Sequence, residues 1–589
     1  MTSKEKVAAL RERMQQENID AFVVFSADPH MSEYLPEKWK ERAWLTGFTG
    51  SAGFAVVTKD KAGLWTDGRY FIQAPKELEG SDFELMKMGE DGVDDYVTWL
   101  KKEVPEEGVV AVQTHAASHQ SWNEMTQGLK EKGITIKNAS LLDSIWTSRG
   151  EEVNNPIFVH PVERAGKSTT DKLSDIRSKM KDYGASIHVI PSLDDVAWTL
   201  NLRGSDVECN PVFLGFVVVR PTNALLFVKE SKLEDNAKKH LEDSGVEVKP
   251  YEEFIPFLKE QKGEKVLVSA SSNQAIFEAL EQDNEFIIAP PPGNLMKAVK
   301  NETELEGFRT VMVRDGVAMV KFMHWLTNTA GKEKLTEYSI GQKLQEFRAA
   351  GDNFVGISFG SIVGYNGNDA IPHYSADAEQ SEEVSAKGSI LVDSGGQYLE
   401  GTTDITRTFP LGEVSKEYIH DSTLVLKGMI RLSMVKFPKG TKGVHLDSIA
   451  RLALWNEGKD YNHGTGHGVG SFMNVHEGPQ NIRKDMNFQD LIPGMVISNE
   501  PGLYIENEYG IRHENLVAVK KSEKTMFGEY YEFETLTICP FFKSAIDASL
   551  LAPEEIEWLN KYHAWVDEKL SPYLEGDVKT WFKEMVSPL

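Results

Sequence analysis

The sequence predicts a mixed α/β (α+β) protein of three domains, and three observations carry this prediction. The chain has 589 residues, about twice the length at which a single hydrophobic core stops growing. Two segments near the start of the chain recur, in the same order, further along. A proline-rich segment then precedes a long helical pattern and two pairs of apolar strands. We therefore expect domains at residues 1–153, 154–298 and 299–589.

An internal repeat defines the first two domains. "LRERMQQENIDAFVVFS" (10–26) aligns without gaps on "IRSKMKDYGASIHVIPS" (176–192). Each predicts an amphipathic helix, a turn and an apolar strand. "AWLTGFTGS" (43–51) is similar to "AWTLNLRGS" (197–205). Two matches in one order predict two related α/β domains that meet near residues 148–156.

The third domain begins after a proline-rich break. "APPPGN" (289–294) cannot continue a helix or a central strand, because proline lacks the amide hydrogen that both need. Asn301 and Glu304 then form the signature of a helix N-terminal cap. The helix that follows carries an apolar stripe, which we expect in the core: Phe308, Val311, Met312, Phe322 and Trp325. Residues 555–574 are amphipathic, and we expect them to pack on this domain.

Charge and cysteine content narrow the functional class. Acidic residues outnumber basic ones by 90 to 64, for a net charge of −26, so we expect neither nucleic acid nor membrane partners. Cys209 and Cys539 cannot form a disulfide framework and match no zinc motif. The charged N-terminus lacks an apolar signal core, and no run of about 18 apolar residues occurs. These features favour a cytoplasmic protein.

Two predicted hairpins of the third domain carry acids on apolar strands. In the first, "SILVD" is a strand that ends on Asp393, "SGGQY" is a turn, and "TTDITRTF" is a strand that carries Asp404. In the second, "MVISNEPG" closes on Glu500 and "GIRHENLVAV" returns with Glu514. Burying a carboxylate on such a strand is costly unless a cation or hydrogen-bond donors compensate.

Four carboxylates would be balanced by two divalent cations. Two metal ions about 3.5–4 Å apart can activate a bridging water as a nucleophile. Oxygen ligands with one imidazole suit Mn²⁺, and Co²⁺ or Zn²⁺ less selectively. An ion-pair network without metal is the alternative, and the spacing alone leaves both open.

A glycine-rich segment, "HGTGHGVGSFMNVHEGP", supplies three histidines: His463, His467 and His476. His463 and His467 have the i,i+4 spacing of a helical zinc pair, but glycines interrupt the segment and no HExxH motif is present. The segment is therefore a poor helix, and we expect its glycines to let the backbone pass close to the metals. Histidines that only bond to the loop backbone are the alternative.

Four segments of the third domain together resemble the pita-bread metallopeptidases, a family that includes methionine aminopeptidase, prolidase, creatinase and aminopeptidase P. They are "GYNGNDAIPHYSA", "LVDSGGQYLEGTTDITRTF", the histidine segment and "GMVISNEPGLYIENEYGIRHENLVAV". "GFTGSAGFAVV", "WTDGRYFIQA" and "NLRGSDVECNPVF" extend the similarity over nearly the whole chain. With them the chain resembles the long, three-domain Xaa-Pro aminopeptidases. The resemblance implies two creatinase-like N-terminal domains and a pita-bread catalytic domain.

The resemblance implies the metal ligands, which are intact here: Asp393, Asp404, His467, Glu500 and Glu514. Asp404 and Glu514 would bridge two divalent ions, Mn²⁺ before Co²⁺ or Zn²⁺. Asp393 would hold one ion, and His467 with Glu500 the other. Glu500 would also take the proton of the attacking water.

The resemblance also gives roles to residues that are not ligands. His373, His463 and His476 match histidines that donate to the substrate carbonyl and the developing oxyanion. His373 would also pass a proton to the departing proline nitrogen. Arg69 resembles a peptide-contacting arginine, and Arg512 would order the carboxylates. For both arginines a surface position is the alternative.

The implied function is a homodimeric, metal-dependent aminopeptidase that releases the N-terminal residue from peptides with proline in second place. Prolidase, which cleaves only Xaa-Pro dipeptides, is the nearest alternative, and the long N-terminal half favours the aminopeptidase. Creatinase works without metal, which the complete ligand set argues against. The same ligand set argues against a non-catalytic binding module of this fold.

Overall fold

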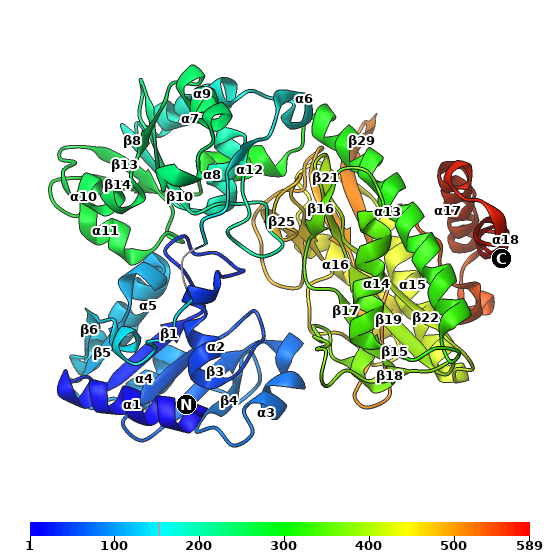
Figure 1. Cartoon of the computed structure of the whole chain (residues 1–589), viewed down its shortest axis with the longest axis horizontal. Helices are drawn as coiled ribbons and strands as arrows, with labels where there is room; N and C mark the ends of the chain where they lie inside the picture. The colour runs from blue at the N-terminus through cyan, green and yellow to red at the C-terminus, as the bar shows by residue number, and fades with distance from the viewer. Residues whose placement is uncertain (151–152) are drawn as a thin grey trace. The chain divides into compact units, whose positions relative to one another are not determined.

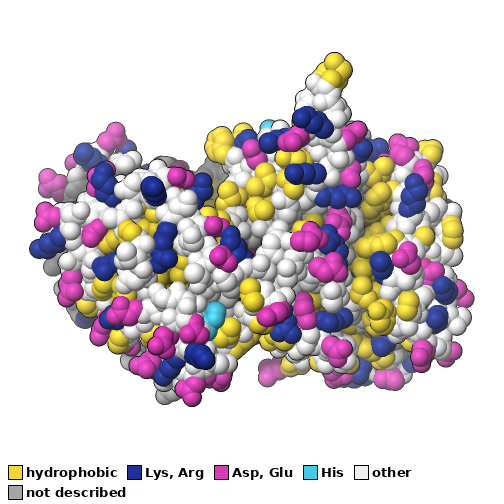
Figure 2. Space-filling view, turned by 90° about the horizontal axis from the view of Figure 1, so that it is seen from above, with side chains coloured by type: hydrophobic (Ala, Val, Ile, Leu, Met, Phe, Trp, Pro, Cys, Tyr) yellow, Lys and Arg dark blue, Asp and Glu magenta, His cyan; other side chains and the backbone are white. Residues whose placement is uncertain are grey.

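The computed structural model describes residues 1–150 and 153–589, and residues 151–152 of the predicted linker lie outside them. The chain divides into two compact units. The first comprises Met1–Val162, Lys167–Glu208 and Val212–Asn294, and the second comprises Glu163–Gly166, Cys209–Pro211 and Leu295–Leu589. Within the described residues, every helix is too short or too polar to cross a membrane. Acidic and basic side chains are interspersed on the face shown in Figure 2.

The first unit contains two six-stranded sheets (Figure 1), in the orders β4-β3-β2-β1-β5-β6 and β12-β11-β10-β8-β13-β14. The first sheet has strands β1 (Ala21–Phe25), β2 (Phe54–Thr58), β3 (Ala62–Thr66), β4 (Glu84–Lys87), β5 (Val109–Val112) and β6 (Thr135–Asn138). The second has β8 (Ile187–Ile190), β10 (Gly215–Val219), β11 (Ala224–Val228), β12 (Val246–Lys249), β13 (Lys265–Val268) and β14 (Glu285–Ile288). Strand β1 pairs antiparallel with β2 and parallel with β5, and β8 pairs in the same way with β10 and β13. The predicted repeat is therefore a repeat of topology.

Helices surround both sheets. Those of the first are α1 (Ser3–Gln16), α2 (Glu41–Thr46), α3 (Gln73–Glu77), α4 (Tyr96–Glu103) and α5 (His119–Leu129). Those around the second are α7 (Thr169–Tyr183), α8 (Leu193–Leu200), α9 (Asp235–Asp243), α10 (Phe254–Lys259) and α11 (Gln274–Leu280). All of α6 (Val162–Ala165) except its first residue belongs to the second unit. A short pair, β7 (Phe158–Val159) and β9 (Leu202–Arg203), accompanies them.

Strand β1 shows why the first sheet has helices on both faces. Successive side chains of a strand point to opposite faces, and all four of its leading residues are apolar. Phe22 and Val24 lie in one core cluster with residues of α1, whereas Ala21 and Val23 lie in another with residues of α4 and α5. The continuous apolar run of this strand thus produces a three-layer module.

The second repeat match, between residues 43–51 and 197–205, also has a structural reason. Helix α2 ends at Gly47 with φ 85°, and α8 ends at Asn201, the aligned position, with φ 50°. Glycine and asparagine are the residues that enter this left-handed conformation at least cost. The two helices therefore end in the same way although their sequences differ there.

The second unit holds the elements of the third predicted domain. Its helices are α13 (Glu302–Thr329), α14 (Glu337–Ala349), α15 (Lys416–Met434), α16 (Gly443–Trp455), α17 (Pro553–Leu570) and α18 (Gly576–Met585). Its first strands are β15 (Leu335–Thr336), β16 (Phe354–Ile357), β17 (Ile362–Tyr365), β18 (Glu383–Val384), β19 (Ser389–Ser394), β20 (Gly396–Tyr398), β21 (Gly401–Thr402) and β22 (Ile405–Pro410). The later ones are β23 (Lys436–Pro438), β24 (Gly466–Gly468), β25 (Glu477–Ile482), β26 (Val496–Asn499), β27 (Gly502–Ile505), β28 (Tyr509–Arg512), β29 (Asn515–Thr525) and β30 (Gly528–Thr535).

Helix α13 begins where the sequence predicts. The Asn301 side chain accepts from the Glu304 amide at 3.1 Å, and the Glu304 carboxylate accepts from the Asn301 amide at 3.0 Å. The predicted stripe is buried at Phe308, Val311, Met312 and Phe322, while Trp325 is partly buried against the same core. The amphipathic tail packs there as well, because residues of α17 and α18 belong to this core.

The proline-rich break ends one element and opens the next. A helix, α12 (Pro292–Ala298), starts inside it. Proline is well tolerated in the first turn of a helix, because the amide hydrogen that it lacks has no intrahelical partner there. The break therefore ends the preceding strand, β14, and opens a helix.

Candidate metal centre

The first pair of acids lies at one end of two neighbouring strands. Strands β19 and β22 pair antiparallel, with Asp393 opposite Thr406. Asp404 precedes β22 and does not lie within it, and the predicted turn contains strand β20; both points correct the sequence prediction. The Thr403 amide donates to the Gly396 carbonyl of β20 at 2.8 Å. The chain therefore leaves the pairing of β20 with β21 before Asp404 and joins the pairing of β19 with β22 after it. That residue belongs to neither ladder.

The second pair repeats this arrangement. Strands β26 and β29 pair antiparallel up to Asn499 opposite Asn515, so Glu500 and Glu514 lie just beyond this last pair. Glu514 therefore precedes β29, where the sequence prediction placed it within a strand. Its amide donates to the Thr406 carbonyl of β22 at 3.1 Å. This bond brings the acidic ends of the two hairpins together.

His467 reaches the acids from β24, a strand rather than a helix. A β-carbon at Gly466 would lie 1.9 Å from the Ser498 carbonyl oxygen, so only glycine permits this close approach to β26. The His467 amide donates to Ser498 Oγ at 2.9 Å, and that hydroxyl donates to Glu500 at 3.0 Å. The glycines thus bring the histidine against the strand that leads to Glu500.

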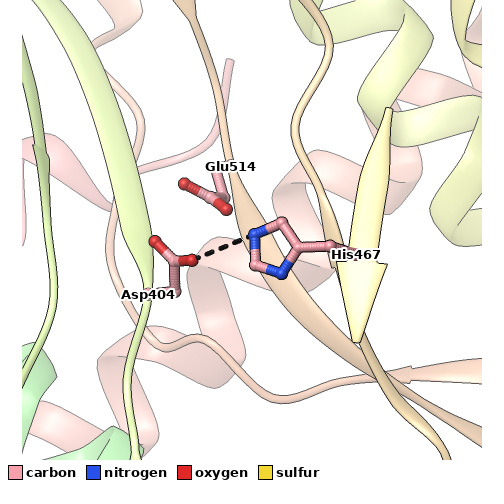
Figure 3. A group of neighbouring side chains, drawn as sticks. All are labelled: Asp404, His467 and Glu514. Atoms are coloured by element: carbon pink, nitrogen blue, oxygen red, sulfur yellow. Dashed lines mark ion pairs between the residues drawn. The ribbon is translucent and has the colours of Figure 1, made fainter. Parts of the chain in front are cut away.

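Three of these side chains meet closely. The ligand atoms of Asp404, His467 and Glu514 lie within 4.8 Å of one another (Figure 3). His467 Nε2 lies 3.3 Å from Asp404 and 3.4 Å from Glu500. Asp393 accepts from Arg512 Nη2 at 2.6 Å with one oxygen. Its other oxygen, Oδ1, and Glu514 Oε1 are buried without a hydrogen-bond partner. Because an unpaired buried carboxylate oxygen is costly, these atoms and this donor set fit divalent cations.

The pKa values of three carboxyl groups are raised because the groups are buried close to other negative charges. Burial, with the charges of Asp404 and Glu500, raises the pKa of Glu514 well above its usual value. Burial and neighbouring carboxylates likewise raise the pKa of Asp393, and that of Glu500 to about 7. Burial alone would lower the pKa of His467, but its hydrogen bond with Asp404 and the charge of Glu500 raise it to about 9. Without metal, the site therefore favours bound protons as its positive charge.

The remaining histidines lie around this cluster. The His476 ring lies 4.3 Å from that of His467. His463 Nε2 is 2.8 Å from the Tyr504 hydroxyl, which also accepts from Arg512 Nη1 at 2.6 Å. His373 follows Pro372, whose carbonyl accepts from Arg512 Nη2 at 3.3 Å. These contacts place His476 beside His467, link His463 to Arg512 through Tyr504, and hold the residue before His373 on Arg512.

Arg512 and Tyr504 link the histidines to the acids. Arg512 is 2% exposed, so its ion pair with Asp393 is a buried one and not the surface bridge considered from sequence. Tyr504 was not predicted as a site residue. Its position in an apolar strand, β27, four residues after Glu500, is the only signal that the sequence offers.

Arg69 belongs to the first unit and is far in sequence from the residues of the metal centre. It lies in a single 3-10 turn, Gly68–Tyr70. Its Nε and Nη2 donate to the Asp67 carboxylate at 2.8 Å and 2.7 Å. The pairing orients the guanidinium, and its predicted contact with substrate stays a prediction.

Three buried carboxylates, the partly buried Glu500 and an imidazole meet at the ends of two hairpins, which is a donor set typical of a metallohydrolase. Residues 306–521 match metallopeptidase family M24, and residues 529–589 match the C-terminal region of its peptidases. Residues 6–145 and 148–304 each match the creatinase/prolidase N-terminal domain. The predicted fold class, two related N-terminal domains before a pita-bread domain, is confirmed by these matches.

Relatives match over the whole chain. The chain is 41% identical to a probable Xaa-Pro aminopeptidase P of Laccaria bicolor, over 100% of this chain and 94% of that one. It is 40% identical to Xaa-Pro aminopeptidase 1 of Dictyostelium discoideum, over 99% and 96%. The chain belongs to the Xaa-Pro aminopeptidase group of family M24.

Solved structures separate this group from prolidase. An X-prolyl aminopeptidase from Caenorhabditis elegans, described as a cytosolic enzyme with a di-nuclear active site, superposes with a TM-score of 0.96 and 34% identity over 100% of both chains. An Xaa-Pro dipeptidase from Bacillus anthracis gives 0.51 and 22%, over 64% of this chain and 99% of that one. The second match shows the fold alone. Full-length similarity therefore favours the aminopeptidase over the prolidase alternative.

Proposed function

We propose that this protein is a metal-dependent aminopeptidase that hydrolyses the bond between an N-terminal residue and a following proline. The observation that carries the proposal is the convergence of Asp404, His467 and Glu514 within 4.8 Å, in a chain that matches Xaa-Pro aminopeptidases over its full length. The substrate class comes from those relatives. The chemistry comes from the residues at the site.

The five predicted ligands would hold two divalent ions: Asp393, Asp404, His467, Glu500 and Glu514. Mn²⁺ fits best, because four of the five donors are carboxylates, and Co²⁺ or Zn²⁺ fit the same set less selectively. When bound, such a metal pair polarises the scissile carbonyl and lowers the pKa of a water molecule. The buried, unpartnered oxygens of Asp393 and Glu514 support this assignment.

The chain's own groups handle protons and orientation. Glu500 is the carboxylate that we assign as acceptor of the proton from the attacking water. His476, beside His467, and His463, held by Tyr504, donate to the oxyanion that develops on the substrate carbonyl. His373 delivers a proton to the proline nitrogen, which as a tertiary amide must gain one to depart.

Substrate length separates the aminopeptidase from prolidase. The aminopeptidase should cleave Xaa-Pro-Yaa tripeptides and longer peptides, and chelation should abolish the activity. Release of the N-terminal residue, followed by mass spectrometry with and without metal, tests both points. Turnover of Xaa-Pro dipeptides alone would identify a prolidase. Metal-free protein that turned over at the full rate would contradict the metal assignment.

Three further features belong to the proposal. We infer a cytoplasmic location, which accords with the charged N-terminus and with the cytosolic description of the Caenorhabditis elegans enzyme. We also infer a homodimer, which light scattering coupled to size exclusion would show as about twice the 66.0 kDa of one chain. Domain boundaries at residues 153–154 and 298–299 would appear as sites of limited proteolysis.

A further inference from the structure

The segment that carries His373 is anchored on both sides of that residue. On one side, the Pro372 carbonyl accepts from Arg512 Nη2 at 3.3 Å. On the other, the Tyr374 hydroxyl donates to Glu337 at 2.7 Å. Arg512 belongs to the carboxylate cluster, whereas Glu337 does not. One of the two anchors of this segment is therefore a carboxylate that lies outside the cluster.

Glu337 is fully buried, at the first residue of α14. Its Oε1 accepts from the Tyr365 amide at 2.8 Å and from Asn368 Nδ2 at 3.0 Å. Its Oε2 accepts from the Tyr374 hydroxyl at 2.7 Å and from the Glu382 amide at 3.0 Å. Four donors to a single buried carboxylate form a satisfied polar network, and such networks make local geometry rigid.

Half of these donors stabilise the fold and half hold the histidine loop. The Tyr365 and Glu382 amides tie α14 to neighbouring backbone, which any structural carboxylate would do. The Asn368 and Tyr374 side chains belong to the loop and lie on either side of His373 in sequence. They also contact each other, at 3.3 Å between Asn368 Nδ2 and the Tyr374 hydroxyl.

We propose that Glu337 is a positioning residue for His373: through Asn368 and Tyr374 it fixes the loop that presents the imidazole to the substrate. This inference rests on the proposed function, in which His373 protonates the leaving nitrogen. Displacing a reacting group by about 1 Å can cost about 10²-fold in rate. A loosened loop should therefore lower kcat without a matching change in KM or in bound metal.

The test uses the full-length, metal-loaded enzyme and an Xaa-Pro-Yaa tripeptide. Glu337→Gln, which replaces two acceptors by one acceptor and one donor, should lower kcat about 10- to 100-fold and leave metal content unchanged. Tyr374→Phe removes one hydroxyl and should lower kcat at least about threefold; it decides the question if Glu337→Gln fails to fold. Glu346→Gln, an exposed glutamate of α14 paired with Lys343, is the matched control and should behave as wild type.

A double-mutant cycle separates positioning from general stabilisation. In a His373→Ala background, Glu337→Gln or Tyr374→Phe should change kcat by less than about twofold, because residues that act as a unit are not additive. Equal losses with and without His373, or wild-type kcat in both folded variants, would overturn the inference. If wild type and Glu346→Gln cleave no Xaa-Pro-Yaa peptide, the proposed function itself is wrong.

Discussion

His467 faces its acidic neighbours through one nitrogen, because its Nδ1 lies 2.9 Å from the Gly468 carbonyl oxygen. That contact makes Nδ1 the donor and leaves Nε2 as the atom that faces Asp404 and Glu500. A metal ligand must be the neutral imidazole, so metal binding here releases a proton. A single backbone carbonyl thus prepares the side chain for coordination.

The first prediction concerns the ligands. His467→Ala and Asp404→Ala should lose bound metal and turnover together, because each removes a donor from the cluster within 4.8 Å. Metal per chain by mass spectrometry and kcat on a tripeptide measure the two effects, and after chelation Mn²⁺ should restore the activity best. His445→Ala, an exposed histidine of α16, is the control. Full activity in either ligand variant would show that its assignment is wrong.

The second prediction concerns the histidines that are not ligands. His373→Ala and His476→Ala should keep their metal but lose about 10²- to 10⁴-fold in kcat, the usual scale for positioned acid–base and oxyanion groups. Metal content and kcat are measured on the same samples. If the rate instead follows metal occupancy, these residues are ligands or supports of the ligands.

For single residues, the sequence predicts a functional site where only a few residue types can carry out the chemistry. Acids at the ends of apolar strands are unusual enough to identify a candidate cation site from sequence. Tyr504 and Glu337 could not be found in this way, since a tyrosine in a strand and a glutamate at a helix start are common in any fold. Their importance arises from partners that are distant in sequence: Arg512 for one, Tyr374 for the other.

At the scale of elements, strand β8 places an ionisable group in a core. His188 is fully buried, with Nδ1 3.0 Å from the Leu267 carbonyl oxygen. Burial lowers the pKa of His188 from 6.5 to about 4. The aligned residue of the first repeat, in β1, is Phe22. The second N-terminal sheet therefore carries a titratable group at a position where the first sheet carries phenylalanine.

The third prediction is an acid sensitivity of this sheet. Between about pH 6.5 and 4 the unfolded chain binds a proton at His188 that the folded sheet excludes, so stability falls as pH falls through this window. The loss from pH 7.5 to 5 is about 2 kcal/mol for one such group. Urea unfolding at both pH values, with hydrogen exchange in β8 and β13, measures it.

His188→Phe tests this directly, because it copies the first repeat and removes the titration. The variant should lose stability at neutral pH, where Leu267 loses a partner, but its pH slope should be smaller by about 2 kcal/mol over the same range. His445→Gln, an exposed histidine, should keep the wild-type slope. An unchanged slope in His188→Phe would place the acid sensitivity elsewhere.

Element boundaries show what the sequence could predict and what it could not. Helix α13 begins where its capping pair predicts, because a cap is a local interaction of Asn301 with Glu304. Asp404 and Glu514 were placed within strands, yet they lie where the chain passes from one ladder to the next. Where a strand changes its pairing partner depends on strands that are distant in sequence, and the local hydrophobic pattern does not predict it.

At the scale of the whole molecule, the repeat and the family segments predicted the architecture well. Two segments that recur in the same order were enough to predict two related α/β domains, because each repeat folds around its own core. The roles proposed for the histidines rest on the resemblance alone. His373 and His463 lie about 90 residues apart in sequence, and neither composition nor periodicity predicts that such distant residues act together.

The last prediction concerns whether Arg69 of the first unit contacts the substrate. Arg69 is oriented by a bidentate pair with Asp67, and a planar guanidinium suits peptide carbonyls or a carboxylate. If it contacts the substrate beyond proline, Arg69→Ala should lower kcat/KM for tripeptides and longer peptides by about 1–3 kcal/mol, with unchanged metal content. Arg13→Ala, which changes a partly exposed arginine of α1 paired with Glu17, is the control. Steady-state kinetics over a series of peptide lengths decides the matter: unaltered values at every length would remove Arg69 from the site and confine substrate recognition to the unit that carries the acids.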